Sequence, residues 1–194
     1  MRKVFTTAFI LILIDQILKI WIKTSFYLGE EIKIFEWFII HFTENNGMAF
    51  GLEFGGYHGK TLLTVSRIII IFFAIKYLYK FISNKIPDGL TICLGLILGG
   101  AIGNVIDSTF YGLIFEESYN KISSFLPKGG GYAPLLHGKV VDMFYFPLIN
   151  SHFPTWVPLL GGDHFIFFRP VFNLADAGIS TGVVLILLFY RRYF

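Results

Sequence analysis

Two aspartates, Asp142 and Asp176, each lie in an apolar stretch and could together form a pair that shares a proton. Two carboxyl groups that lie close together cannot both ionise, so one of them stays protonated. One member can then activate a water molecule while the other polarises a carbonyl group, as in aspartic proteases. The loop of residues 143–175 is long enough to fold back and bring them together. The two residue types therefore predict peptidase chemistry.

Each aspartate also has a structural interpretation. Asn173 is typical of a helix N-cap, which would put Asp176 in the first turn, where an acid gains roughly 0.3–1 kcal/mol from the helix dipole. Asp142 could be a turn residue or the ion-pair partner of Lys139. The dipole would also favour Asp176 as the ionised member of a pair, although two coupled acids titrate as a unit.

Four more polar residues lie inside apolar runs, where an Asp or Lys at a helix centre costs about 2.5–3.5 kcal/mol. Asp15 and Lys19 are four residues apart, so they lie on one helix face and can form an ion pair. We favour this supporting role over a chemical one. Asn104 and Asp107 follow Gly99-Gly100-Ala101-Ile102-Gly103. A G-x-x-x-G pattern explains the glycines by close helix contact, whereas Asn104 and Asp107 need partners or water.

Other catalytic classes fit the sequence less well. The His-Glu-x-x-His motif of zinc proteases is missing, and the five histidines are scattered. Ser180 has no histidine placed to activate it. Cys93 is the single cysteine, which excludes a disulfide within the chain, and we interpret it as a small buried apolar residue.

The elements that must position these residues are membrane helices. Hydrophobic residues make up 55% of the 194 residues and charged residues 15%, against about 25% charged in a soluble domain. A spanning helix needs about 20 mostly apolar residues. Four segments qualify, within a few residues: 4–23, 62–82, 90–107 and 172–190. Residues 1–194 are thus expected to form one membrane-embedded domain, and a net charge of +3 is too small to indicate nucleic-acid binding.

The charges that flank these spans predict an orientation. Arg2 and Lys3 precede the first span, Lys80 and Lys85 lie around the second connection, and Arg191 and Arg192 follow the last span. By the positive-inside rule, both termini are cytoplasmic. The first span is expected to be retained, because Asp15 and Lys19 interrupt it and no small-x-small cleavage site follows.

The longer connections, residues 24–61 and 108–171, then face the opposite side. The first has partly alternating residues and the turn signal Asn46-Gly47, so we expect a small β-rich domain on the non-cytoplasmic membrane surface. The fold class is therefore membrane α-helical, with four transmembrane helices and this surface domain.

These same residues resemble the motifs of bacterial lipoprotein signal peptidases (signal peptidase II). Five similar boxes occur in the family's order and frame nearly the whole chain. They are Asp15-Gln16-Ile17-Leu18-Lys19, Asn45-Asn46-Gly47-Met48-Ala49-Phe50-Gly51, Gly99 to Asp107, Val140-Val141-Asp142 and Phe172-Asn173-Leu174-Ala175-Asp176. Any one box is weak, but the ordered set is specific.

The resemblance implies a peptidase of the bacterial inner membrane, with its site near the outer face. The family removes the signal peptide from prolipoproteins, just before a cysteine that carries a diacylglyceryl group, and is inhibited by globomycin. Its catalytic pair matches Asp142 and Asp176. Asn45, Gly47, Asn104 and Asn173 match residues that place the substrate, whereas Asp15, Lys19 and Asp107 look supportive. The resemblance implies neither a metal nor an organic cofactor. The partners would be lipid-modified prolipoproteins and the bilayer, and we expect a monomer.

Two departures from the family pattern are visible. Ser108 stands where the family usually has an arginine that helps to hold the substrate, and Lys139 or Arg169 is a candidate substitute. The connection 109–139 is longer than usual and could elaborate the outer surface or form a lid.

Two other classes compete with a peptidase. In a small transporter or channel subunit, the intramembrane acids would line a polar path. However, no inverted repeat is visible, and the polar groups gather at one membrane boundary. The second class is a non-catalytic assembly factor that uses the G-x-x-x-G face.

Overall fold

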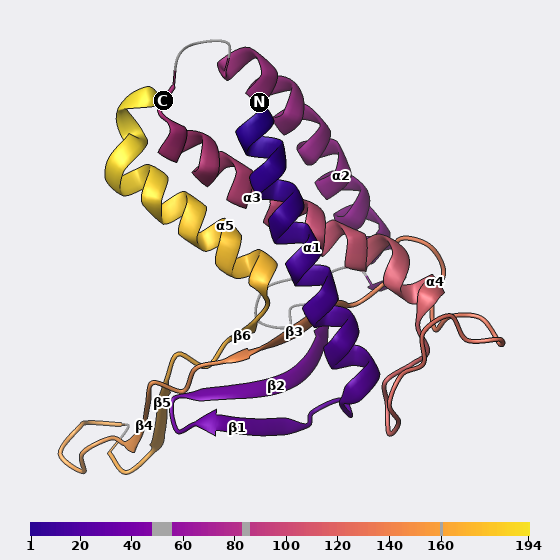
Figure 1. The fold of residues 1–194 in the computed structure, drawn as a ribbon. Helices are drawn as coiled ribbons and strands as arrows, with labels where there is room; N and C mark the ends of the chain where they lie inside the picture. The colour runs from indigo at the N-terminus through magenta and orange to yellow at the C-terminus, as the bar shows by residue number, and fades with distance from the viewer. Residues whose placement is uncertain (48–55, 83–85, 160) are drawn as a thin grey trace.

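Four long helices and a small sheet make up the computed structural model, which describes residues 1–47, 56–82, 86–159 and 161–194. The long helices are α1 (Arg2–Ser25), α2 (Gly56–Phe81), α3 (Asp88–Ile106) and α5 (Leu174–Leu185). After α3 the chain continues through a π-helical turn, η2 (Asp107–Tyr111), into α4 (Gly112–Ile114); after α5 it continues through η3 (Ile186–Tyr190) and η4 (Arg191–Tyr193). Figure 1 shows both chain ends at one end of the bundle and the sheet at the other.

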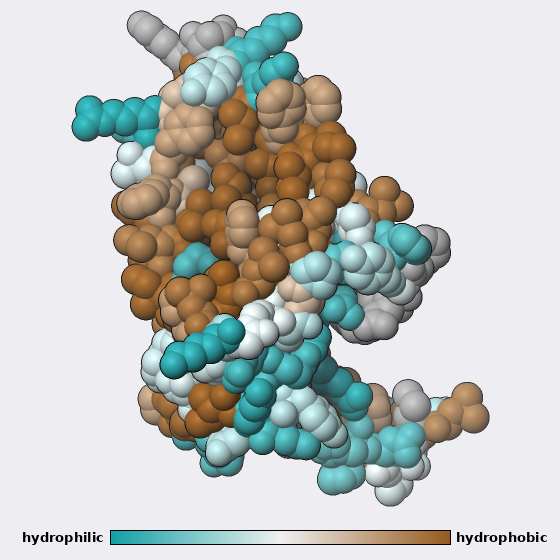
Figure 2. Space-filling model, turned by 90° about the vertical axis from the view of Figure 1, so that its right-hand side faces the viewer, coloured by the Kyte–Doolittle hydropathy of each residue, from teal (hydrophilic) through white to brown (hydrophobic). Residues whose placement is uncertain are grey.

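Among the described residues, four helical segments are long and apolar enough to cross a membrane. They are α1, α2, Asp88–Ile114 (α3 continued by η2 and α4) and Leu174–Tyr193 (α5 continued by η3 and η4). In the most apolar window of α2, only 11% of the residues are buried within the protein, so large side chains such as Ile70, Phe72 and Phe73 face outward. Figure 2 shows the same pattern: hydrophobic side chains cover the middle of the helical part, and hydrophilic ones gather at its two ends. A surface of this kind is stable in lipid, so the chain is a membrane protein.

Two helices extend beyond the spans expected from hydropathy. α2 begins at Gly56 rather than at residue 62, and the third span continues through η2 and α4 to Ile114 rather than ending at 107. Both extensions carry polar residues that lower the local hydropathy. Lys60 and Ser108 nevertheless remain inside helical structure because their side chains point into the protein, where they are buried.

α3 lies between α1 and α5, and small residues allow this close packing. A Cβ atom on Gly99 would lie 2.8 Å from Cα of Ala8 in α1, and one on Gly100 would lie 2.3 Å from the carbonyl oxygen of Ala175 in α5. Both contacts are with backbone atoms, which cannot move aside as a side chain can. The glycines therefore set how closely α1 and α5 approach α3.

The four-stranded antiparallel sheet has the order β1 (Glu31–Phe35), β2 (Phe38–Asn45), β3 (Val140–Tyr145), β6 (Val171–Phe172). β4 (Ile149–His152) and β5 (His164–Phe167) form a separate hairpin. The first hairpin turns at residues 36–37, because Phe35 pairs with Phe38. Asn46-Gly47, which gave the turn signal in the sequence, instead follows the end of β2, where Gly47 has a φ of +90°.

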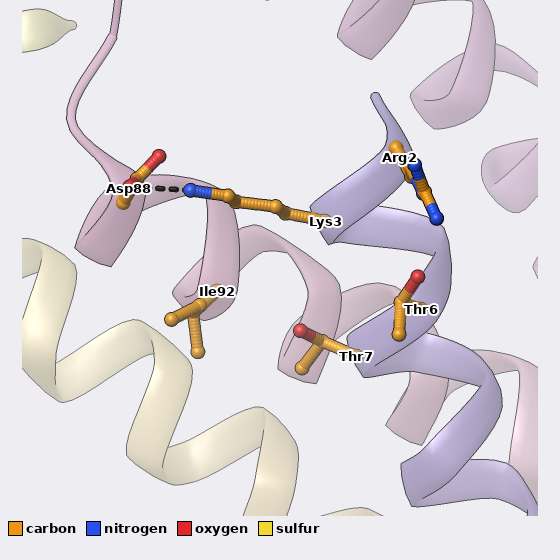
Figure 3. A pocket seen from close by; sticks show the side chains of 6 residues that line it. All are labelled: Arg2, Lys3, Thr6, Thr7, Asp88 and Ile92. Atoms are coloured by element: carbon orange, nitrogen blue, oxygen red, sulfur yellow. Dashed lines mark ion pairs between the residues drawn. The ribbon is translucent and has the colours of Figure 1, made fainter.

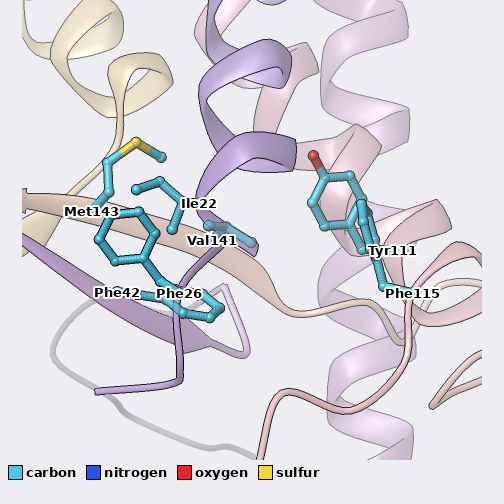
Figure 4. Close-up of a cluster of buried hydrophobic side chains, with 7 residues drawn as sticks. All are labelled: Ile22, Phe26, Phe42, Tyr111, Phe115, Val141 and Met143. Atoms are coloured by element: carbon cyan, nitrogen blue, oxygen red, sulfur yellow. The ribbon is translucent and has the colours of Figure 1, made fainter. Parts of the chain in front are cut away.

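An apolar cluster joins the sheet to the helices. Figure 4 shows side chains from the end of α1, from β2 and β3, and from the region around α4. All are buried: Ile22, Phe26, Phe42, Tyr111, Phe115, Val141 and Met143. Burying each large apolar side chain contributes about 1.5–3 kcal/mol, so the cluster holds β3 firmly against the helix ends.

The long connection between α3 and β3 packs onto three elements. The Ser118 hydroxyl is 2.7 Å from Nζ of Lys23 in α1 and donates to Glu44 in β2. Further along, the carbonyl oxygen of Leu136 accepts a hydrogen bond from Thr64 in α2. Of the two roles considered for this segment, the contacts favour a packed part of the surface over a lid.

Candidate active site

The sheet brings Asp142 and Asp176 to one place. Asp142 lies in β3, and the chain leaves this strand for the β4–β5 hairpin. It returns as β6, which pairs with β3 so that Phe172 lies opposite Phe144. The next residue, Asn173, begins α5, and Asp176 lies in its first turn. The antiparallel pairing thus closes the loop of residues 143–175.

Asn173 links the two aspartates directly. Its Nδ2 donates to Oδ1 of Asp142 over 2.6 Å, and its Oδ1 accepts from the backbone N–H of Asp176 over 2.9 Å. The Asp176 carboxylate in turn accepts from the backbone N–H of Asn173, which completes a capping box. The expected N-cap is confirmed, and the capping residue also binds the second acid.

Asn104 of α3 binds the other side of Asp176. Its Nδ2 donates to Oδ1 of Asp176 over 2.7 Å. Its own Oδ1 accepts from Nζ of Lys19 at 2.9 Å and from Nδ2 of Asn173 at 3.2 Å. Because two donors occupy the oxygen, the amide can only present its NH₂ group to the acid.

Asn45 of β2 holds Asp142 in the same manner. Thr43 lies opposite Asp142 across the strand pair, so Asn45, two residues further on, projects from the same face. Its Nδ2 donates to Oδ2 of Asp142, while its Oδ1 accepts from the backbone N–H of Gly47. Three asparagines thus direct NH₂ groups at the two carboxyl groups.

A group of buried charges supports the two aspartates and the three asparagines that bind them. Lys19 forms ion pairs with Asp15 at 2.8 Å and with Asp107 at 2.7 Å, and all three side chains are fully buried. Asp15 also accepts from the backbone N–H of Ala175 in α5, and Asp107 from that of Val141 in β3. The expected pairing of Asp15 with Lys19 is present, and it connects α1, α3, β3 and α5 beneath the aspartates.

Asp142 lies in a setting that favours its neutral form. Its exposed fraction is 4%. This burial, followed by repulsion from Asp176, raises the pKa of Asp142 to about 7. Lys139, which the sequence offered as an ion-pair partner for Asp142, instead pairs with Glu117 at 2.9 Å and with Glu44 at 3.6 Å. That alternative was wrong, because Lys139 directly precedes the first residue of β3 and lies beside these two glutamates.

Two pockets differ in their relation to the aspartates. One of about 220 Å³ lies between α2, α3 and α5 and is lined by Asp176, Asn104 and Arg67 together with aliphatic residues. The other, of about 480 Å³, lies near the chain start. Figure 3 shows the Lys3 ammonium reaching Asp88 there. Only the first can present a substrate to the aspartates. In the described part of the chain, no group of three or more His, Cys, Asp or Glu residues could hold a metal ion.

Comparison with known proteins shows the family. A model of the signal peptidase (SPase) II family matches residues 7–192. The chain belongs to the signal peptidase II family. A relative from Porphyromonas gingivalis named lipoprotein signal peptidase is 48% identical over 184 residues, which cover 94% of this chain and 80% of the relative. Relatives of the same name from Amoebophilus asiaticus and Chlorobium phaeobacteroides (strain BS1) are 39% and 32% identical, covering 96% and 100% of this chain and 76% and 99% of their own lengths.

A solved structure shares the fold of this signal peptidase II. It is described as a bacterial membrane enzyme and matches with a TM-score of 0.63 at 22% identity, over 97% of this chain and 92% of its own. The four long helices with a small sheet at one end therefore form a known membrane-enzyme fold.

Position 108 of this signal peptidase II differs from the family pattern, and the structure shows what lies there. Ser108 is fully buried, and Nζ of Lys60 in α2 lies 3.5 Å from its hydroxyl. Neither proposed substitute takes this place, because Lys139 pairs with glutamates and Arg169 is exposed. The cation that contacts Ser108 comes from another helix.

Three residues near the site were missed by the sequence interpretation. Gln16 donates to Asp107 over 2.8 Å and accepts from Tyr111, although it was quoted only as part of a motif. Lys60 and Arg67 both lie on α2, where Arg67 shares a pocket with Asp176 and Lys60 contacts Asn46 and Ser108. Arg67 could have been found, since it is a charged residue within a predicted span, as Asp15 and Lys19 are. The residues 48–51 of the second family box, including Phe50, lie outside the described residues.

Proposed function

We propose that this chain is an aspartyl endopeptidase that removes the signal peptide from diacylglyceryl-modified prolipoproteins, cleaving before the lipidated cysteine. The observation that supports this most is the asparagine-linked pair of Asp142 and Asp176, with a pocket beside Asp176. The family membership agrees with this chemistry, and the comparisons give no support to a transporter or channel subunit. Residues 1–194 would act as one membrane-embedded domain.

In the proposed reaction, Asp142 carries the shared proton and Asp176 is ionised. Asp176 takes a proton from water as the water oxygen attacks the scissile carbonyl carbon. Asp142 gives its proton to the carbonyl oxygen, which yields a neutral tetrahedral intermediate. The C–N bond then breaks as Asp176 returns its proton to the leaving amine and Asp142 recovers its own. The assignment follows from the burial of Asp142 and from the position of Asp176 in the first turn of α5.

The other site residues would prepare this pair. Asn45, Asn104 and Asn173 each have one N–H directed at a carboxyl group. The second N–H of Asn45 and of Asn104 would bind the substrate backbone, whereas that of Asn173 is used within the site, where its Nδ2 also donates to Asn104. Gly47 orients Asn45 through its backbone N–H. The buried charges would act only by holding the aspartates and asparagines in place; they are Asp15, Lys19 and Asp107.

The proposed setting is the bacterial inner membrane, with both termini cytoplasmic and the sheet at the outer boundary. Water can reach that boundary, while lipid holds the apolar signal peptide and the acyl chains. We expect the enzyme to work as a monomer with lipid-modified prolipoproteins and the bilayer as partners. No cofactor and no nucleic acid take part in the proposed reaction, and globomycin should inhibit it.

Cleavage of a lipidated precursor by the purified protein in detergent tests this proposal. Asp142→Asn and Asp176→Asn should each lower kcat by about 1000-fold or more, as expected for groups that act in the chemical step. Release of the signal peptide is followed on a gel, and thermal unfolding shows that each variant folds. Asp88→Asn is the matched control, because this exposed acid lies at the other end of the bundle. Full activity in either of the first two variants removes that acid from the catalytic pair.

A further inference from the structure

Two cations of α2 lie near the site: Arg67 lines the pocket that contains Asp176, and Nζ of Lys60 lies 3.5 Å from the hydroxyl of Ser108. Lys60 and Arg67 are seven residues apart, so they lie on the same face of the helix. Among the residues that the structure describes, neither has a carboxylate within ion-pair distance of 4.0 Å. A charged residue in a membrane helix is costly, so these two positions require an explanation.

Part of the explanation is a clamp on the end of β2. Lys60 donates from Nζ to the carbonyl oxygen of Asn46 over 2.9 Å, and Arg67 donates from Nη2 to that of Gly47. These carbonyls directly follow Asn45, which binds Asp142. The clamp uses one of the five N–H donors of Arg67. Since Lys60 holds the neighbouring carbonyl, the end of β2 keeps a support when Arg67 is replaced.

The other surroundings of Arg67 are those of a binding site. Arg67 lines the pocket of about 220 Å³ that also contains Asp176 and Asn104, and its charge interacts with that of Asp176. The remaining lining is aliphatic: Ile70, Ile71, Ala101, Val105 and Ile179. Such a pocket combines apolar walls with a few convergent polar groups, as ligand sites do.

We propose that Arg67 binds a main-chain carbonyl oxygen of the signal peptide in this pocket, beside Asp176, while the aliphatic walls receive a peptide side chain. The inference rests on the proposed function and names a substrate-binding residue for it. A peptide carbonyl that leaves water without a hydrogen bond is destabilised. Within the pocket, an ionised Asp176 can only accept hydrogen bonds, and Asn104 has one of its two N–H donors directed at Asp176. The guanidinium is thus the principal donor for such a carbonyl.

Kinetics of Arg67→Gln test the proposal. The variant should lower kcat/KM by roughly 10- to 100-fold, the range for loss of one hydrogen bond to a charged group. The loss should appear chiefly in KM, with kcat at neutral pH retained, because the contact is made to the bound substrate as well as to the transition state. Arg67→Lys, which keeps a donor, should recover part of the loss. Lys76→Gln, an exposed cation on the same helix, should behave as the unchanged protein.

A substrate change identifies the contact itself. Lipidated peptides in which one non-scissile carbonyl at a time is replaced by a methylene group are compared with the unchanged enzyme and with Arg67→Gln. At one position, carbonyl removal should cost the unchanged enzyme about tenfold or more and cost the variant little, because both changes delete the same bond. Costs that stay additive at every position would overturn the proposal.

Two further outcomes of the kinetics would also overturn it. Unchanged KM with a lower kcat and a shifted pH profile would mean that Arg67 acts only on the aspartates, through Gly47 and Asn45 on Asp142 or by its charge on Asp176. Unchanged kinetics would mean that it does neither. Both outcomes leave the proposed function standing, because that depends on Asp142→Asn and Asp176→Asn.

Discussion

Single residues in this site owe their chemistry to the hydrogen-bond partners on each side of them. Each asparagine has its carbonyl oxygen occupied by a donor, so only its NH₂ group can meet a carboxyl group. Asp142 and Asp176 are the same residue type, yet burial distinguishes them, since Asp142 is nearly inaccessible whereas Asp176 borders a pocket. In the proposed reaction, these different surroundings give two identical side chains the separate tasks of acid and base.

The pKa of Asp142 predicts how activity depends on pH. Burial and the neighbouring Asp176 raise it to about 7, so Asp142 keeps its proton below this pH and loses it above. If Asp142 is the general acid, kcat/KM should fall about tenfold per pH unit above pH 7. A pH–rate profile with purified enzyme measures this. Constant kcat/KM up to pH 9 would contradict the assignment of Asp142 as the acid.

The pH dependence of unfolding provides a second test of the raised pKa of Asp142. Its pKa rises from 3.8 to about 7 in the folded protein, so between these values the folded state binds more protons than the unfolded state. Stability must therefore fall as the pH rises through this window. This contribution to the pH dependence of Tm should be missing in Asp142→Asn.

At the scale of elements, the position of Asp176 depends on how closely α5 approaches α3. Gly100 touches the backbone of Ala175, next to Asp176. Asn104, one turn further along α3, binds the Asp176 carboxylate. β6 fixes the start of the same helix, because it pairs with β3. One small residue and one short strand thus determine where the second acid lies.

Gly100→Ala should therefore impair both stability and catalysis. Its Cβ would lie 2.3 Å from the carbonyl oxygen of Ala175, so α5 must move away from α3. We expect a loss of roughly 1–3 kcal/mol in the free energy of unfolding, typical of overpacking, and a lower kcat from the displaced Asp176. Thermal unfolding and the cleavage assay measure these effects.

Gly129→Ala is the matched control, because a Cβ there meets no atom within 4 Å. Equal effects of the two substitutions would show that close packing at Gly100 does not matter.

In the whole molecule, the basic residues near the chain ends and the two aspartates lie at opposite ends of the helix bundle. Figure 1 places both chain ends opposite the sheet, and η4 adds Arg191 and Arg192 to Arg2 and Lys3 at that end. The aspartates lie at the sheet end, where β3 and the start of α5 meet. The positive-inside rule therefore predicts that the basic end faces the cytoplasm and that the aspartates face outward.

Labelling of single cysteines tests this orientation. Cys93 is the one cysteine and is buried, so Cys93→Ala gives a background without an accessible thiol. A membrane-impermeant maleimide should label Gly129→Cys in spheroplasts and Arg192→Cys only after lysis. The reverse pattern would place the aspartates on the cytoplasmic side. Each variant must retain cleavage activity for its labelling to count.

The sequence by itself determined the helices, because runs of apolar residues long enough to span a bilayer need no tertiary information. It also pointed to the Asp15–Lys19 pair and to the Asn173 cap, since both depend on spacings within one helix. Hydropathy located the ends of α2 and of the third span less well, because buried polar residues such as Lys60 and Ser108 lower it locally.

Only the tertiary structure decided which polar groups meet. The clamp of Lys60 and Arg67 on β2 and the pairing of Lys139 with glutamates both depend on contacts between segments that are distant in the sequence. The link between the aspartates through Asn173 is of the same kind, since it requires β6 to pair with β3. The spacing of residues in the sequence predicts interactions within one helix or strand. The packing of several elements fixes the distances on which hydrogen bonds and shared protons between elements depend.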